Sequence, residues 1–192
     1  MIDYRLVARA IDAYEREGYD YVETPWLVSG NALEATLPSD RHGFRLGHPA
    51  REPRSNCLVG SAEQGFLQLM LDDALRPGHY CSAGPCFRDE PTVDDQHQLS
   101  FFKIELIHYL GQNQDWLDAT NPRVMAHHAD MVMWRLFDKE HELKCVQTEA
   151  GYDLQINGVE VGSYGKREHA GHRWVYGTGL ALPRATFAVG RR

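Results

Sequence analysis

The feature that most constrains the fold is a pair of extended segments on either side of a short acidic turn. Residues 79–88 (HYCSAGPCFR) and 98–110 (QLSFFKIELIHYL) are typical of strands, and DEPTVDDQ at 89–96 lies between them. A connection this short joins neighbouring antiparallel strands. The sequence therefore predicts a long hairpin within a sheet.

The segments around this hairpin predict helices followed by short strands. Apolar residues at helical spacing predict helices over 2–17, 62–76 and 122–139. Extended chain is expected at 19–28 and a surface loop at 38–54, and short strands are expected at 143–148, 152–156, 159–165 and 172–179, with Asn157–Gly158 as a tight turn. Helices beside hairpin-connected strands favour an α+β domain, in which an antiparallel β-sheet has helices packed on one face.

Length and composition indicate one globular domain over residues 1–192. The chain is 43% hydrophobic and 24% charged, without a repeat or low-complexity tract, which excludes a disordered or fibrous protein. It contains no apolar run near the roughly 20 residues needed to cross a bilayer, and its start lacks the apolar core of a signal peptide. We therefore expect a cytoplasmic protein with no membrane partner.

Charge and cysteine spacing exclude two further classes of protein. Twenty Lys and Arg against 27 Asp and Glu give a net charge of −7, the wrong sign for a protein that binds nucleic acid mainly by neutralising phosphates. Any RNA contact must therefore be local. The four cysteines form no CxxC pair and no zinc-type spacing, so we expect reduced, buried thiols at Cys57, Cys81, Cys86 and Cys145.

The hairpin carries the residues with the most chemical meaning. Arg88 at the end of the first strand offers a planar fork of donors that suits a phosphate, and Glu90 lies two residues further on, on the same face. Phe101 on the second strand can supply a flat apolar surface for a purine ring. The alternative is a surface ion pair between Arg88 and Glu90, with Phe101 in the core.

FRDE (87–90) followed by HQLSFFKIE (97–105) resembles motif 2 of the class II aminoacyl-tRNA synthetases, over about residues 80–109. EGYDYVETPWL, within about 8–28, is similar to motif 1, with Pro25 as its proline. GTGLALPRATFAV, within about 172–190, is similar to motif 3, with Arg184 as its arginine. The resemblance covers nearly the whole chain and implies a class II synthetase-like catalytic domain that forms a homodimer through motif 1. Motif 1 would expose Val22, Trp26 and Val28 in a monomer.

The resemblance implies that ATP and an amino acid react to form an aminoacyl-adenylate. Arg88 would bind the α-phosphate, and Glu90 would accept a hydrogen bond from the adenine amine. Phe101 would stack on one face of the base, Arg184 would cover the other face and reach the γ-phosphate, and His97 would lie near the β- and γ-phosphates. Arg88 and Arg184 would be the catalytic residues, because they stabilise the charge that builds on the phosphates.

Two shorter matches imply sites for the amino acid and for Mg²⁺. GSAEQ (60–64) resembles the TxE-type element that binds the substrate ammonium, which makes Ser61 and Glu63 candidates; the alternative is a helix cap by Ser61 with Glu63 in the first turn. Because side chains alternate along a strand, Glu105 is expected on the same strand face as Phe101, which allows a polar or charged substrate. VEVGSYG (159–165) resembles the ELxS segment before motif 3, so Glu160 and Ser163 are candidate magnesium ligands, against a solvated Glu160.

The resemblance also has departures, which leave the acceptor open. Pro183 stands where motif 3 has an acidic residue, and Ala181 replaces a glycine. The chain leaves no room for an anticodon-binding, tRNA-arm or editing domain, so we expect a catalytic core alone. It would transfer the aminoacyl group to the acceptor end of a tRNA, or to a carrier protein, a protein lysine or a small amine. A catalytically silent paralogue and chance matches in an ordinary domain are the remaining alternatives.

Overall fold

The computed structural model describes residues 2–37, 43–47, 56–94, 98–115, 121–137 and 141–190. Its helices are α1 (Tyr4–Arg16), α2 (Gly30–Glu34), α3 (Ala62–Leu71), α4 (Pro122–Phe137) and α5 (Arg184–Ala188). Its strands are β1 (Asp20–Tyr21), β2 (Leu27–Val28), β3 (Cys57–Leu58), β4 (Gly78–Phe87), β5 (Ser100–Gln112), β6 (Leu143–Gln147), β7 (Gly151–Ile156), β8 (Val159–His169) and β9 (His172–Leu182).

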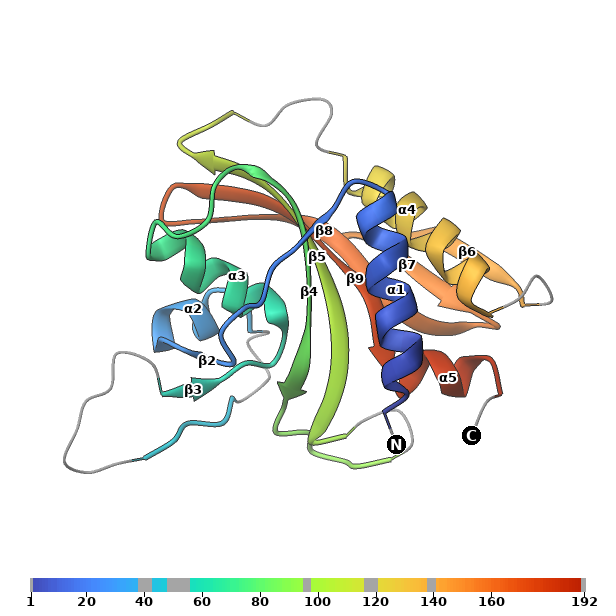
Figure 1. Ribbon diagram of the computed structural model, residues 1–192. Coiled ribbons are helices and arrows are strands. Elements are labelled where there is room, and N and C mark those ends of the chain that lie inside the picture. Colours follow the sequence, from blue (N-terminus) through green and yellow to red (C-terminus); the bar gives the residue numbers. More distant parts are fainter. Residues whose placement is uncertain are drawn as a thin grey trace.

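The main sheet has seven strands in the order β1-β4-β5-β9-β8-β7-β6, and β2 and β3 form a separate pair (Figure 1). The predicted hairpin is confirmed, since β4 and β5 pair antiparallel from Gly78 opposite Tyr109 to Phe87 opposite Ser100. The predicted antiparallel sheet is confirmed from β4 to β6, and at the other edge β1 runs parallel to β4. Between these two strands the chain passes through β2, α2, β3 and α3, and a crossover of this kind returns it in the same direction.

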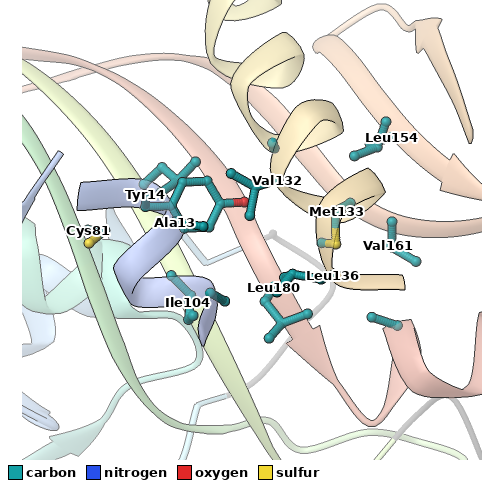
Figure 2. Packing of buried hydrophobic residues seen from close by; sticks show 14 of the residues in the cluster. Ala13, Tyr14, Cys81, Ile104, Val132, Met133, Leu136, Leu154, Val161 and Leu180 are labelled. Atoms are coloured by element: carbon teal, nitrogen blue, oxygen red, sulfur yellow. The ribbon is translucent and has the colours of Figure 1, made fainter. Parts of the chain in front are cut away.

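Helix α1 packs on one face of the sheet beside α4 (Figure 1). The carboxylate of Asp3 caps α1 by accepting from the backbone N–H groups of Arg5 and Leu6 at 3.0 and 3.1 Å. The phenol of Tyr14, whose ring lies among the buried side chains of Figure 2, donates to the carbonyl oxygen of Gly179 at 2.6 Å. A Cβ at Gly179 would lie 2.8 Å from the Tyr14 ring, so this contact requires a glycine on β9.

Helices α2 and α3 cover the opposite face of the sheet, so the expectation that all helices lie on one face is wrong (Figure 1). The physical reason lies in β5, which is apolar on both sides. Ile104 and Leu106 join the core under α1 and α4, whereas Ile107 and Tyr109 join the core under α3. A strand that is buried on both faces needs a layer of structure on each side.

The element boundaries follow the sequence with local exceptions. Helix α3 ends at Leu71 rather than at residue 76, and the chain reaches a positive φ of 53° at Asp73. Asn157 and Gly158 both have positive φ, 50° and 80°, as a tight hairpin turn requires. Of the loop expected at 38–54, only 43–47 are described, and residues 138–139 at the expected end of α4 lie outside the described part.

All four cysteines are free, and Cys57, Cys81 and Cys86 are buried as predicted. Cys145 is exposed, which corrects the expectation for this residue, because β6 is the last strand of the sheet and is largely uncovered. None of the helices in the described part of the chain is long and apolar enough to cross a membrane.

Candidate active site

Arg88 lies directly after β4, and its side chain is held against the sheet. Its Nε donates to the carbonyl oxygen of Gly60 at 3.2 Å, and its guanidinium carbon lies 5.1 Å from the centroid of the Phe101 ring. A Cβ at Gly60 would meet the Arg88 side chain at 3.5 Å and the carbonyl oxygen of Phe87 at 3.3 Å, so glycine leaves room for this approach. Phe101 is half-buried and lines a pocket, which disfavours the alternative in which it belongs to the core.

The pocket beside Phe101, which we call the first pocket, is formed by the ends of β4 and β9, the starts of β5 and β8, and the first residue of α5. These segments are far apart in the sequence, and the sheet order β5-β9-β8 places them side by side. Six residues predicted from the sequence line this pocket: Arg88, Glu90, Phe101, Glu160, Ser163 and Arg184.

Arg184 opens α5 and faces the start of β8. Its guanidinium lies 3.8 Å from a carboxylate oxygen of Glu160. Pro183, the departure from motif 3, is the N-terminal cap of α5, and its carbonyl oxygen accepts from the backbone N–H of Phe187 and the hydroxyl of Thr186. The proline therefore still leads into a helix that begins with the arginine.

A second carboxylate, which the sequence reasoning missed, lies close to Glu160. Asp153 on β7 is the register partner of Ser163 on β8. Burial raises the pKa of Asp153, and repulsion from Glu160 raises it further. The carboxylates of Asp153 and Glu160, together with the hydroxyl of Ser163, form a set of hard oxygen donors. Within the described residues, no group of three or more His, Cys, Asp and Glu side chains could by itself hold a metal ion.

A second pocket lies on the same face of the sheet, between α3 and the strands β5, β8 and β9. It contains the three residues predicted to bind the amino acid: Ser61, Glu63 and Glu105. The Ser61 hydroxyl donates to Oε1 of Glu105 at 2.6 Å, and the Lys103 ammonium pairs with the same oxygen. Neither of these two contacts uses Oε2 of Glu105.

Glu63 is buried in the first turn of α3, and both of its oxygens have partners. Oε2 accepts from Arg167 at 2.6 Å, and Oε1 accepts from the indole N–H of Trp174 at 2.7 Å. Burial raises the pKa of Glu63, and Arg167 and Trp174 oppose that shift. Ser61 also caps α3, accepting from the N–H of Glu63 at 3.3 Å, so the helix-cap alternative describes part of what these two residues do.

The two pockets meet at four residues that line both: Arg88, Lys103, Ser163 and Thr178. Two of the four are cationic. An anionic group at this junction would therefore lie against Arg88 and Lys103, with the first pocket on one side of it and the second on the other.

One predicted residue, His97, is not among those the structure describes, and two residues that were not predicted, Arg167 and Thr36, line the second pocket. Arg167 lines the second pocket and was not predicted, although it lies an even number of positions after Ser163 on β8 and therefore shares its strand face. Thr36 lines the same pocket from the segment after α2, and no sequence signal marks it.

Comparisons with known proteins agree with the motifs. No family model matches the chain. The serine–tRNA ligase of Cenarchaeum symbiosum (strain A) is 24% identical over 106 residues, 54% of this chain. A Desulfitobacterium hafniense pyrrolysyl-tRNA synthetase superposes with a TM-score of 0.69 at 18% identity, covering 96% of this chain and 67% of its own.

The seryl-tRNA synthetase of Pyrococcus horikoshii, solved in complex with ATP, superposes with a TM-score of 0.70 at 18% identity, covering 97% of this chain and 49% of its own. The match to the Cenarchaeum symbiosum ligase spans about a quarter of that relative's length. The chain has the fold of the catalytic domain of class II aminoacyl-tRNA synthetases.

Proposed function

We propose that this protein activates an amino acid with ATP to form an aminoacyl-adenylate. The observation that carries the proposal is the junction of the two pockets, where Arg88 and Lys103 separate a site lined by Phe101 and Arg184 from a site lined by Glu63 and Glu105. An ATP in the first pocket and an amino acid in the second would meet with the α-phosphate beside two cations.

The proposed reaction requires positioned charge rather than a general base. An oxygen of the amino-acid carboxylate attacks the α-phosphorus, the bond from that phosphorus to the bridging oxygen breaks, and pyrophosphate leaves with the bonding electrons. Negative charge builds on the phosphate oxygens in the transition state. Arg88 stabilises it at the α-phosphate and Arg184 at the γ-phosphate, from the lining of the first pocket.

The nucleotide is recognised by residues around Phe101. Adenine stacks on the Phe101 ring with Arg184 on its other face, and Glu90 accepts a hydrogen bond from the adenine amine. Arg88 already lies over Phe101, so an adenine that stacks there displaces the guanidinium toward the phosphates. His97 assists at the β- and γ-phosphates.

Magnesium fits the oxygen donors beside Arg184. Glu160 and Ser163 line the first pocket and offer the hard oxygens that Mg²⁺ prefers, with Asp153 as a neighbouring carboxylate. A bound Mg²⁺ would neutralise part of the charge on the phosphates. It would also relieve the repulsion between Asp153 and Glu160.

The amino-acid ammonium is bound in the second pocket. Glu105 keeps Oε2 for this role, because Ser61 and Lys103 both use Oε1. Glu63, with both oxygens engaged, contributes its negative charge and holds Arg167 in place.

The proposed acceptor is the 3′ end of a tRNA, as in the relatives named for tRNA ligation. A second candidate is a non-tRNA acceptor, such as a carrier protein, a protein lysine or a small amine. The net charge of −7 favours it, because an acidic protein attracts a polyanion weakly. Both candidates start from the same adenylate, and under both the protein acts in the cytoplasm.

Amino-acid-dependent exchange of pyrophosphate into ATP tests the proposed function. Arg88→Ala should abolish exchange while the circular dichroism spectrum stays that of the wild type. Arg135→Ala is a matched control, since this half-exposed arginine pairs with Glu17 on the opposite side of the sheet, away from both pockets. Unchanged exchange in Arg88→Ala, or equal loss in both variants, would contradict the assignment.

A further inference from the structure

The hydroxyl of Thr36 is a buried polar group without a partner. Thr36 is 8% exposed, and its Oγ1 has no hydrogen bond among the described residues. Within the described part of the chain, it is the one buried side-chain oxygen or nitrogen that lacks a hydrogen-bond partner. Buried hydroxyls are normally paired, because an unpaired one loses its bonds to water and gains nothing in return. Thr36 lines the second pocket, so a bound molecule can supply the missing partner.

Arg167 presents further donors to the same pocket. Its guanidinium carbon lies 4.4 Å from the centroid of the Tyr176 ring, which fixes the plane of the group. One N–H donates to Glu63 at 2.6 Å. A guanidinium carries five N–H donors, so Arg167 has donors beyond the one that Glu63 accepts. The side chain is 31% exposed and lines the pocket.

The remaining lining disfavours an apolar or a cationic side chain. Glu63 is paired with Arg167, and Glu105 is paired with Lys103 through Oε1 and keeps Oε2 for the amino-acid ammonium under the proposed function. A cationic side chain would therefore meet two resident cations. Among the lining residues that the structure describes, the apolar groups are Leu37 and the ring of Tyr176, and Arg167 covers that ring.

We infer that Thr36 and Arg167 select the substrate by hydrogen-bonding an oxygen on the side chain of the amino acid. The inference rests on the proposed function, since it takes the second pocket as the amino-acid site. The substrate class is amino acids whose side chain carries a hydroxyl, amide or carboxylate oxygen. The Thr36 hydroxyl and the Arg167 guanidinium donate to that oxygen, and apolar and cationic side chains are rejected.

The test is the binding of non-hydrolysable adenylate analogues to the full chain. Isothermal titration would compare aminoacyl-sulfamoyl adenosines carrying seryl, asparaginyl, aspartyl, alanyl, leucyl and lysyl groups, with ATP alone as reference. One of the three oxygen-bearing analogues should bind tightest, at least about tenfold tighter than the alanyl analogue. The three of them distinguish a hydroxyl, an amide and a carboxylate as the group that is read.

Thr36→Val isolates the hydroxyl at nearly constant shape. It should weaken the preferred analogue about tenfold and leave the alanyl analogue unchanged. Thr24→Val is the matched control, because Thr24 is buried and pairs with Ser82 outside both pockets, so it should not alter the order of preference. Arg167→Lys, which keeps the charge but loses the planar fork, should also weaken the preferred analogue more than the alanyl one.

Two results would overturn the inference while ATP still binds. One is tightest binding by the alanyl, leucyl or lysyl analogue. The other is an equal effect of Thr36→Val on all six analogues. If neither ATP nor any analogue binds to the folded protein, the proposed function itself fails, and the inference fails with it.

Discussion

Thr24 and Thr36 are both buried threonines, and they differ in what their hydroxyls contact. Oγ1 of Thr24 lies 2.9 Å from the hydroxyl of Ser82, whereas Oγ1 of Thr36 has no partner among the described residues. Thr24→Val should lower the free energy of unfolding by about 1–3 kcal/mol, because it leaves the Ser82 hydroxyl buried and unpaired. Thr36→Val should leave that free energy unchanged or raise it. Urea denaturation measures both, and a larger loss in Thr36→Val would contradict the structure.

Glu90 is the residue that should distinguish adenine from guanine. Its carboxylate can accept from the amine of adenine and repels the carbonyl oxygen that guanine carries at the same position. Glu90→Gln removes the charge and adds an amide donor. The preference for ATP over GTP, measured by competition in pyrophosphate exchange, should therefore fall. Equal discrimination in the variant and the wild type would argue against this role for Glu90.

At the scale of single residues, the sequence predicts side chains that belong to a spaced motif. Arg88, Glu90 and Phe101 flank one hairpin, so their proximity follows from local chain geometry. Thr36 and Arg167 come from segments that are far apart in the sequence, and they share a pocket only because of the tertiary fold. No periodicity records such a contact, and so Thr36 was missed.

At the scale of elements, the hairpin of β4 and β5 carries a pair of stacked histidines. His79 and His108 are opposite in register, and their ring centroids lie 3.9 Å apart. Burial lowers the pKa of His108 to about 4, and the nearby His79 contributes to the shift. Burial also lowers the pKa of His79, with a contribution from His128. The pair is therefore held neutral in the folded chain.

These histidines should make the fold sensitive to acid. Their pKa values in the folded chain lie below the unfolded value of about 6.5, so the unfolded chain binds more protons between about pH 6.5 and pH 4. The free energy of unfolding should fall as pH falls through this range. The urea midpoint should be lower at pH 5 than at pH 7.5, and His108→Gln should reduce that difference. The same decrease in both proteins would contradict the prediction.

The elements themselves were largely predictable from local patterns, and their layering was not. Periodic apolar residues located α1 and α4, and the turn residues located the hairpins. The placement of helices on both faces follows from β5, where Ile104 and Ile107 face opposite cores. Apolar residues at both odd and even positions of a strand are typical of burial on both faces, and the parallel pairing of β1 depends on a crossover that local sequence does not encode.

At the scale of the whole molecule, the motif 1 segment leaves apolar side chains uncovered. Tyr21, Trp26 and Leu27 are 41%, 51% and 39% exposed. Val28, which was expected to be exposed, is instead buried in the core under α3, and Val22 packs at the edge of that core. Exposed apolar side chains in this segment are what the homodimer implied by the motif 1 resemblance would cover.

Sedimentation tests this proposal. The wild type should sediment as a dimer, and Trp26→Glu should shift it toward the monomer, because a charge would be buried in the interface. Val146→Glu on β6 is the matched control, since Val146 is exposed at 38% and β6 forms the edge of the main sheet opposite to β1. A monomeric wild type at high concentration, or dissociation by both substitutions alike, would count against the motif 1 interface.

The most direct test of the central claim is pyrophosphate exchange by the wild-type chain with each of the twenty amino acids. The assay contains ATP and Mg²⁺ and omits tRNA, so it measures adenylate formation separately from transfer. The account predicts exchange that depends on one amino acid, or on a few with an oxygen in the side chain. No exchange with any amino acid, from protein that is folded and binds ATP, would contradict the claim that this chain forms an aminoacyl-adenylate.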